Sequence, residues 1–201
     1  MLMQTSDFVK CYAAGRRDFT GVVLREADLR RMTFAGVELM AADLSGADLR
    51  DTKFLRSRLI GIHAGGATFR RARFVGANFR EAYLVDVDMR SVVLFQADLS
   101  MADLCGSDLR RVDLRGATLI STIFMGANII DGRLGGATLI GANFTGADLT
   151  NVDLHNTDLT GADFTGAVLI GANLRNSRLT GAAFEGADFS LAIMPDGSIH
   201  K

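Results

Sequence analysis

Residues 145–167 read TGADLTNVDLHNTDLTGADFTGA. Within this stretch a large apolar residue returns at every fifth position, at Leu149, Leu154, Leu159 and Phe164, and aspartate precedes each of them. A spacing of five matches neither the 3.6-residue period of an α-helix nor the two-residue period of a flat strand. The stretch therefore predicts a backbone that turns after every five residues.

The same frame runs through nearly the whole chain. An apolar residue, which we call the centre of its pentad, recurs in steps of five from Phe19 to Met194, so that residues 17–196 form 36 consecutive pentads. A small residue, usually alanine, stands two positions before most centres, and positions two apart on an extended segment point the same way. Glycine stands two positions after many centres and suits a corner. We therefore expect a coil with the centres and the small residues inside.

A longer period gives the number of pentads in each turn of the coil. Phenylalanine centres recur at positions 34, 54 and 74 and again at 124, 144, 164 and 184, and arginine follows the centre at 30, 50, 70, 90 and 110. Both series have a period of twenty, which predicts four pentads per turn and stacked rings. The pentad at 62–66 departs from the pattern, with Ile62 at the small site and Ala64 at the centre, and we interpret it as a volume-conserving exchange.

The two ends of the repeat need covers, because the open edges of a solenoid otherwise pair with other chains. Residues 1–16 are expected to form an N-terminal helical cap, with Thr5 or Ser6 as the capping residue and Gly15 at the end of the helix. Residues 197–201 form a C-terminal tail behind a Pro-Asp-Gly turn. The tail is expected to close the last coil, and a dimer contact is the alternative.

The tandem A(D/N)LxG-like units resemble the pentapeptide-repeat proteins, over 180 of the 201 residues. This resemblance implies an all-β fold, a right-handed, quadrilateral parallel β-helix of about nine coils. YAAGRRDF at 12–19 and AIMPDGSIH at 192–200 are similar to the termini of cyanobacterial members, among them a regulator of heterocyst differentiation. That regulator has a loop insertion in its repeat, whereas the frame here is unbroken, so a function that depends on the loop does not carry over.

Composition and motifs give no indication of an enzyme. The formal charge is −1, no apolar run approaches the roughly 20 residues of a membrane span, and the first residues lack a signal-peptide pattern. The three histidines have no partners at metal-binding spacing, and Cys11 and Cys105 fall too far apart in the coil to form a disulfide. We expect a cytoplasmic protein that has no catalytic residues, no metal and no cofactor, and that does not bind nucleic acid or membrane directly.

Aspartate or asparagine precedes about half of the centres, which raises the possibility of DNA mimicry, as in relatives that protect DNA gyrase. Such mimicry needs a strongly negative surface. Residues 1–100 instead carry 15 basic and 12 acidic side chains, and residues 101–201 carry 7 and 11. We favour the interpretation that the acidic residues cap corners and keep the rod solvated.

Two rows of outward positions are the candidate partner-binding site. The arginine row consists of Arg30, Arg50, Arg70, Arg90 and Arg110, and the apolar row on the adjoining face consists of Leu55, Val75 and Phe95. Asp28, Asp48, Asp88 and Asp108 lie two residues before four of the arginines. A lattice of surface ion pairs explains this pattern, and a docking strip for an acidic partner is the alternative. A second outward apolar group lies at Ile120, Ile123, Met125 and Ile130.

Three functions follow as hypotheses. The leading one is a non-enzymatic scaffold that binds a regulatory protein, which the resemblance places in cyanobacteria and connects with heterocyst differentiation. The second is topoisomerase protection by DNA mimicry. The third is a structural or oligomerising rod, and the chain is expected to be a monomer or an end-to-end dimer.

Overall fold

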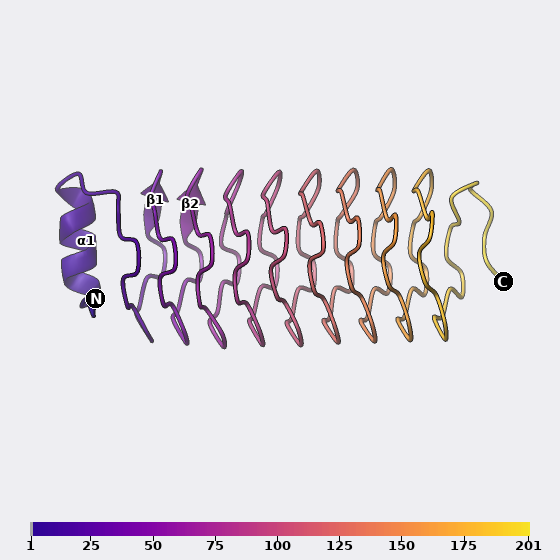
Figure 1. Cartoon of the computed structure of the whole chain (residues 1–201), viewed down its shortest axis with the longest axis horizontal. Coiled ribbons are helices and arrows are strands. Elements are labelled where there is room, and N and C mark those ends of the chain that lie inside the picture. Colours follow the sequence, from indigo (N-terminus) through magenta and orange to yellow (C-terminus); the bar gives the residue numbers. More distant parts are fainter. Residues whose placement is uncertain (1) are drawn as a thin grey trace.

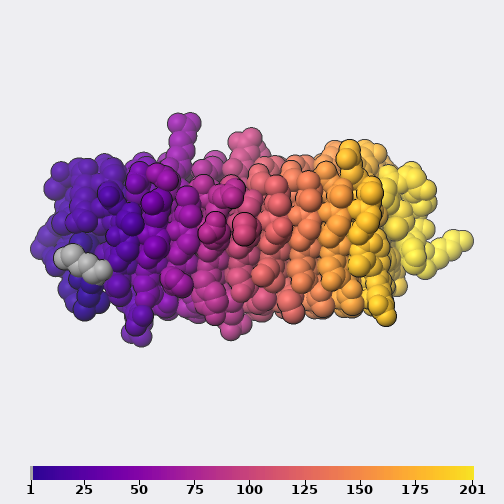
Figure 2. Space-filling view, viewed as in Figure 1, coloured from indigo at the N-terminus to yellow at the C-terminus, as the bar shows by residue number. Residues whose placement is uncertain are grey.

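The computed structural model describes residues 2–201 as a coil with twenty residues in each turn. Parallel bridges join residues twenty positions apart, from the pair Asp18 and Glu38 to the pair Asn173 and Ile193. The turns stack into a rod with the chain termini at opposite ends (Figure 1). The space-filling view shows the rod as an elongated solid (Figure 2). The predicted period of twenty is confirmed.

Regular secondary structure is sparse because each straight segment is only a few residues long. The helix α1 spans Thr5–Ala13, and the strands β1 (Thr33–Ala35) and β2 (Lys53–Leu55) pair in parallel with Phe34 opposite Phe54. Elsewhere each segment meets the next coil through an isolated bridge. The architecture is thus β-helix-like, without a continuous closed sheet.

A corner lies at every fifth residue from 21 to 191, where φ is positive. Glycine occupies many corners, as the sequence predicts, because it adopts positive φ without steric strain. Within residues 2–201, eighteen non-glycine residues also have positive φ, among them Met101 (φ 62°) and Leu191 (φ 61°). The coil therefore imposes the left-handed conformation at four corners in each turn, including those whose side chains resist it.

The centres and the small residues fill the interior of the coil. Ile62 and Ala64, the exchanged pair, are both fully buried, so this pentad keeps the core filled. Phe124, Phe144 and Phe164 stack face to face with ring centroids 4.9 Å apart, which confirms the predicted ring stack. Serine or threonine replaces alanine at several small sites, and its hydroxyl donates to a backbone carbonyl, as Thr122 Oγ1 does to Leu99 O at 2.9 Å.

The helix α1 covers the first coil. The ring of Phe8 is buried against Phe19 and Phe34, with centroids 4.5 and 5.3 Å apart, and Tyr12 contacts Phe34 at 5.0 Å. The predicted capping residues were wrong. Gln4 occupies the N-cap position without a side-chain hydrogen bond, because Thr5 and its successors already belong to the helix.

The C-terminal tail folds back on the coil instead of leaving it. Ile193 and Ile199 form an antiparallel bridge, and the His200 amide donates to the Ala192 carbonyl at 2.8 Å. The tail covers only part of this end, because Phe184 and Phe189 in the last coil remain partly exposed.

Candidate functional site

The arginine row lies on one side of the rod, one residue per coil, because each arginine directly follows a buried centre. Bridges between Asp28 and Asp48, Asp48 and Thr68, Thr68 and Asp88, and Asp88 and Asp108 align the five coils. The arginine side chains are 35–49% exposed. The guanidinium groups are therefore accessible, while their stems lie along the surface.

Four members of the arginine row are held by the aspartate two residues earlier. Arg50 donates from Nε and Nη2 to Asp48, with Nη2 2.6 Å from Oδ2, and the other three pairs repeat this geometry. Hydrogen bonds from Arg30 lower the pKa of Asp28 to about 2, and the bonds from Arg50 and Arg110 lower the pKa values of Asp48 and Asp108. Most of the arginine row is therefore a lattice of ion pairs within the protein.

Arg70 is the exception. Thr68 stands where the other four coils have aspartate, and the nearest carboxylate oxygen to the Arg70 guanidinium belongs to Asp88, at 3.9 Å. Asp88 is already bound by Arg90, whose Nη2 lies 2.5 Å from Oδ2. Within residues 2–201, Arg70 donates no side-chain hydrogen bond, and Thr68 Oγ1 is buried without a partner.

The corner residues beside the arginine row, at positions 51, 71, 91, 111 and 131, also include one that interrupts a series of ion pairs. Arg71 pairs with Asp51 through two hydrogen bonds of 2.7 and 2.8 Å, and Arg111 lies 3.8 Å from Asp131. Ser91 occupies the corner between these two pairs. Its short side chain lines a hollow beside Arg111.

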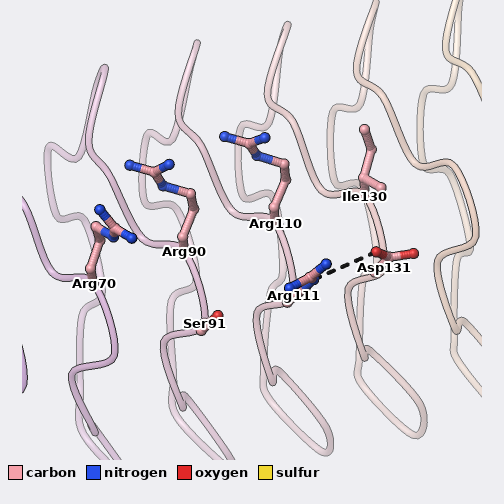
Figure 3. Close-up of a pocket in the computed structure, with 7 residues that line it drawn as sticks. All are labelled: Arg70, Arg90, Ser91, Arg110, Arg111, Ile130 and Asp131. Atoms are coloured by element: carbon pink, nitrogen blue, oxygen red, sulfur yellow. Dashed lines mark ion pairs between the residues drawn. The ribbon is translucent and has the colours of Figure 1, made fainter.

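Arg70 and Ser91, the residues at these two irregularities, both line a groove of about 430 Å³. Figure 3 shows three members of the arginine row in successive coils, with Ser91 and Arg111 at the corner beside them and Arg111 directed toward Asp131. The residues that line the groove are Arg70, Arg90, Ser91, Arg110, Arg111, Ile130 and Asp131. The groove is open, basic and apolar at one end, and it can hold an anionic side chain.

The apolar row lies on the next side of the rod. Leu55 is 40% exposed, Val75 and Phe95 are half-buried, and the Arg115 guanidinium lies 5.8 Å from the centre of the Phe95 ring. Lys53, Arg73 and Val93 stand between the apolar row and the corner that carries Ser91. The two rows therefore lie on adjoining sides of the rod, without being in direct contact.

Sequence reasoning identified the arginine row but missed Thr68 and Ser91. The signal was present, because position 68 breaks the twenty-residue series of aspartates at 28, 48, 88 and 108. The consequence of that break for Arg70 became visible only when distances between neighbouring coils were known.

Groups suited to catalysis do not converge in the part of the chain that the structure describes. Among residues 2–201 no group of three or more His, Cys, Asp or Glu side chains could hold a metal ion. Burial, together with Asp103, raises the pKa of the Cys105 thiol to about 11, which leaves this thiol a weak nucleophile at neutral pH. None of the helices described is long and apolar enough to cross a membrane.

Comparison with known proteins shows that the repeat of this chain matches a known family. The family model described as Pentapeptide repeats matches eight copies, which cover residues 18–54, 56–90, 72–111, 93–131, 133–166 and 157–194. HetL, a pentapeptide repeat protein involved in heterocyst differentiation regulation from the cyanobacterium Nostoc sp. strain PCC 7120, is 30% identical. The match covers 98% of this chain and 100% of HetL, with a TM-score of 0.33.

Two further solved structures are similar to this chain. A pentapeptide repeat protein from the Arabidopsis thaliana thylakoid lumen is 30% identical over 56% of this chain and 72% of its own, with a TM-score of 0.31. QnrB1, a plasmid-mediated fluoroquinolone resistance protein, is 16% identical over 84% of each chain, with a TM-score of 0.46. No curated protein is significantly similar to this chain in sequence.

Proposed function

Because this chain belongs to the pentapeptide-repeat family, we propose that it is a non-enzymatic scaffold that binds another protein. The observation that carries the proposal is the groove at Ser91, with four arginines around it on an otherwise regular rod. Arginine beside aliphatic and aromatic side chains is the composition of interface cores. The neighbouring apolar row supplies such side chains, led by Leu55 at 40% exposure.

The finer proposal is a cyanobacterial regulatory adaptor of the HetL type. Two features support it: the 30% identity to HetL over nearly the full length of both chains, and the N-terminal YAAGRRDF and C-terminal AIMPDGSIH stretches. The partner would be a regulatory protein, and heterocyst differentiation is the process in which to look for it. We place the protein in the cytoplasm, and the free thiols of Cys11 and Cys105 fit a reducing compartment.

The scaffold we propose is a right-handed, four-sided parallel β-helix of about nine coils. Bridges at an interval of twenty residues and a corner at every fifth residue support four sides per coil. The right hand is the one that the family resemblance implies.

The test is affinity capture from a cyanobacterial lysate with the purified protein as bait, read by mass spectrometry. Reversing Arg50, Arg70 and Arg90 together is a poor probe, because Arg50 and Arg90 hold Asp48 and Asp88 and their reversal would destabilise the coil. Arg70→Glu changes the one arginine of the row that has no close intramolecular partner. Arg178→Glu, on an exposed position of another side, is the matched control.

We expect wild type and Arg178→Glu to capture the same specific protein and Arg70→Glu to lose it. Equal capture by all three baits would remove the groove from the proposal. Failure of wild type to retain any specific protein would contradict the scaffold itself.

Topoisomerase protection is the alternative function. The four carboxylates on the side of the arginine row face intramolecular arginines, and the net charge is −1, so this surface lacks the strong negative field that DNA mimicry needs. A gyrase supercoiling assay tests the alternative directly, since inhibition or protection at micromolar protein would favour it. A purely structural rod is the remaining possibility, and it predicts no specific partner.

A further inference from the structure

The side of the rod that carries the arginine row has one vacant position in a repeated arrangement. In four coils an aspartate carboxylate accepts two side-chain hydrogen bonds from the arginine two residues later. The Oδ1 atom of the same aspartate also accepts a hydrogen bond from the backbone amide of that arginine, and this bond is 3.1 Å long between Arg50 and Asp48. In the third coil Thr68 replaces the aspartate. The amide and the guanidinium of Arg70 therefore lack the acceptor that their counterparts have.

The charges around the groove do not cancel. The groove has four positive side chains and three negative ones, which leaves one positive charge. The positive ones are Arg70, Arg90, Arg110 and Arg111, and the negative ones are Asp88, Asp108 and Asp131. The surplus belongs to Arg70, because Arg90 and Arg110 hold hydrogen-bonded carboxylates and Arg111 faces Asp131. A single carboxylate would balance this surplus, whereas a phosphate dianion would exceed it.

We propose that an aspartate or glutamate side chain of the partner protein enters the groove and pairs with Arg70, as Asp48 pairs with Arg50 within the chain. This inference rests on the proposed scaffold function and specifies the chemistry of the partner. The partner segment is acidic, and its carboxylate completes the series of ion pairs that Thr68 interrupts. The groove of about 430 Å³ beside Ser91 provides the space for that side chain.

The decisive variant is Thr68→Asp, which supplies the missing carboxylate from within the chain and leaves every arginine in place. The variant restores the pattern of the neighbouring coils, so the fold should be retained, and thermal unfolding followed by circular dichroism checks this. Thr118→Asp is the matched control, because Thr118 occupies the same position of a pentad on another side, also half-exposed and followed two residues later by Ile120.

The first measurement uses a fluorescein-labelled decaglutamate peptide and a decaglutamine peptide of the same length, with binding followed by fluorescence anisotropy at low salt. We expect wild type and Thr118→Asp to bind decaglutamate more tightly than decaglutamine. Thr68→Asp and Arg70→Gln should each weaken decaglutamate binding by about fivefold, the scale of a partly exposed ion pair. Unchanged binding by either variant, or equal binding of the two peptides to wild type, would overturn the inference.

The second measurement separates this inference from the proposed function. Capture of a specific protein from the lysate by wild type and Thr118→Asp, but not by Thr68→Asp, supports both. Capture by all three shows a scaffold whose partner does not use Arg70, which overturns the inference alone. Absence of specific capture by wild type contradicts the scaffold, and with it the inference that depends on it.

Discussion

Arg50 and Asp48 form two parallel side-chain hydrogen bonds on the surface of the coil, and the arrangement recurs in four of the five coils of the arginine row. The two residues lie two positions apart on one straight segment, so their side chains point to the same face of the coil. The spacing thus places opposite charges together within a coil and like charges about 5 Å apart between coils. The pairing offsets the repulsion that stacked arginines would otherwise create.

The first prediction concerns acid. The pKa of Asp28 is about 2 and those of Asp48 and Asp108 are lowered, against about 3.9 in an unfolded chain. A carboxylate with a lower pKa in the folded state stabilises that state above about pH 4, and the contribution is lost as the pH falls through the folded pKa. The Tm of wild type should therefore fall between about pH 4 and pH 2.

The variant Arg50→Gln, Arg90→Gln, Arg110→Gln isolates this effect for Asp48, Asp88 and Asp108. Its Tm should lie about 2–4 °C below wild type at pH 7, and the difference should shrink toward pH 2. Aspartates bonded to serine or threonine, such as Asp158, titrate in both proteins and cancel in the comparison. A difference that stays constant from pH 7 to pH 2, measured by circular dichroism, would contradict the assignment.

The second prediction concerns the ring stack. Phe144 lies between Phe124 and Phe164 with both centroids 4.9 Å away, and it is fully buried. Phe144→Ala should lower the free energy of unfolding by about 3–5 kcal/mol, because it removes the ring and leaves a cavity between two coils. Phe95→Ala, at a half-buried outward position, should have a smaller effect in the same urea titration. Equal losses would indicate that the stack adds nothing beyond surface packing.

The third prediction concerns the corners. Met101 has φ of 62°, so Met101→Gly should raise the free energy of unfolding by about 0.5–1 kcal/mol by removing steric strain. Gly161 has φ of 68°, and a Cβ there would meet no atom within 4 Å. Gly161→Ala should therefore lower the free energy of unfolding by about 1 kcal/mol through its backbone conformation alone. The opposite sign for either variant in chemical denaturation would contradict the imposed corner.

The fourth prediction concerns the open end of the rod. Interior centres donate to the following coil, as the Leu174 amide does to the Ile193 carbonyl at 2.8 Å, whereas within residues 2–201 the amides of Phe184 and Phe189 donate to no other coil. Both rings are partly exposed there. We propose that two chains associate through this end, because uncovered edges and apolar surface favour pairing.

Sedimentation velocity over a range of concentrations checks the proposal. Wild type should pass from monomer to dimer as its concentration rises, and Phe184→Asp should remain monomeric. His63→Asp, an exposed position in the middle of the rod, should behave as wild type. A wild type that is monomeric throughout would show that the C-terminal tail is a sufficient cover.

The repeat made the coil predictable from the sequence, because the core admits one large and one small residue per pentad. The period of twenty, the ring stack and the exchange of Ile62 with Ala64 were all read correctly. The N-cap of the helix was not predicted correctly. Gln4 occupies that position because of where the chain meets the first coil, and its side chain makes no capping hydrogen bond. Positive φ at Met101 was also missed, because the stacked coils override the local preference of that residue.

The candidate site was only partly predictable. The arginine row follows from counting, but the difference between Arg70 and its neighbours depends on which coil supplies each carboxylate. Thr68 is an unremarkable residue until the distances to Asp88 and Arg90 are known. The roles of the arginine row and the apolar row in binding stay predictions.

The corner at every fifth residue has a consequence for how such a surface can change. Removing five residues, such as 116–120, would leave each centre over another centre, so the interior would stay filled. Every residue after the deletion would nevertheless move to the preceding side of the rod. The side chains that lie in line with Arg110 in the following coils would then be different ones. A family built on this coil can therefore rotate one half of its surface by a quarter turn against the other, and so change which residues face a partner together, while every remaining core residue keeps its inward position.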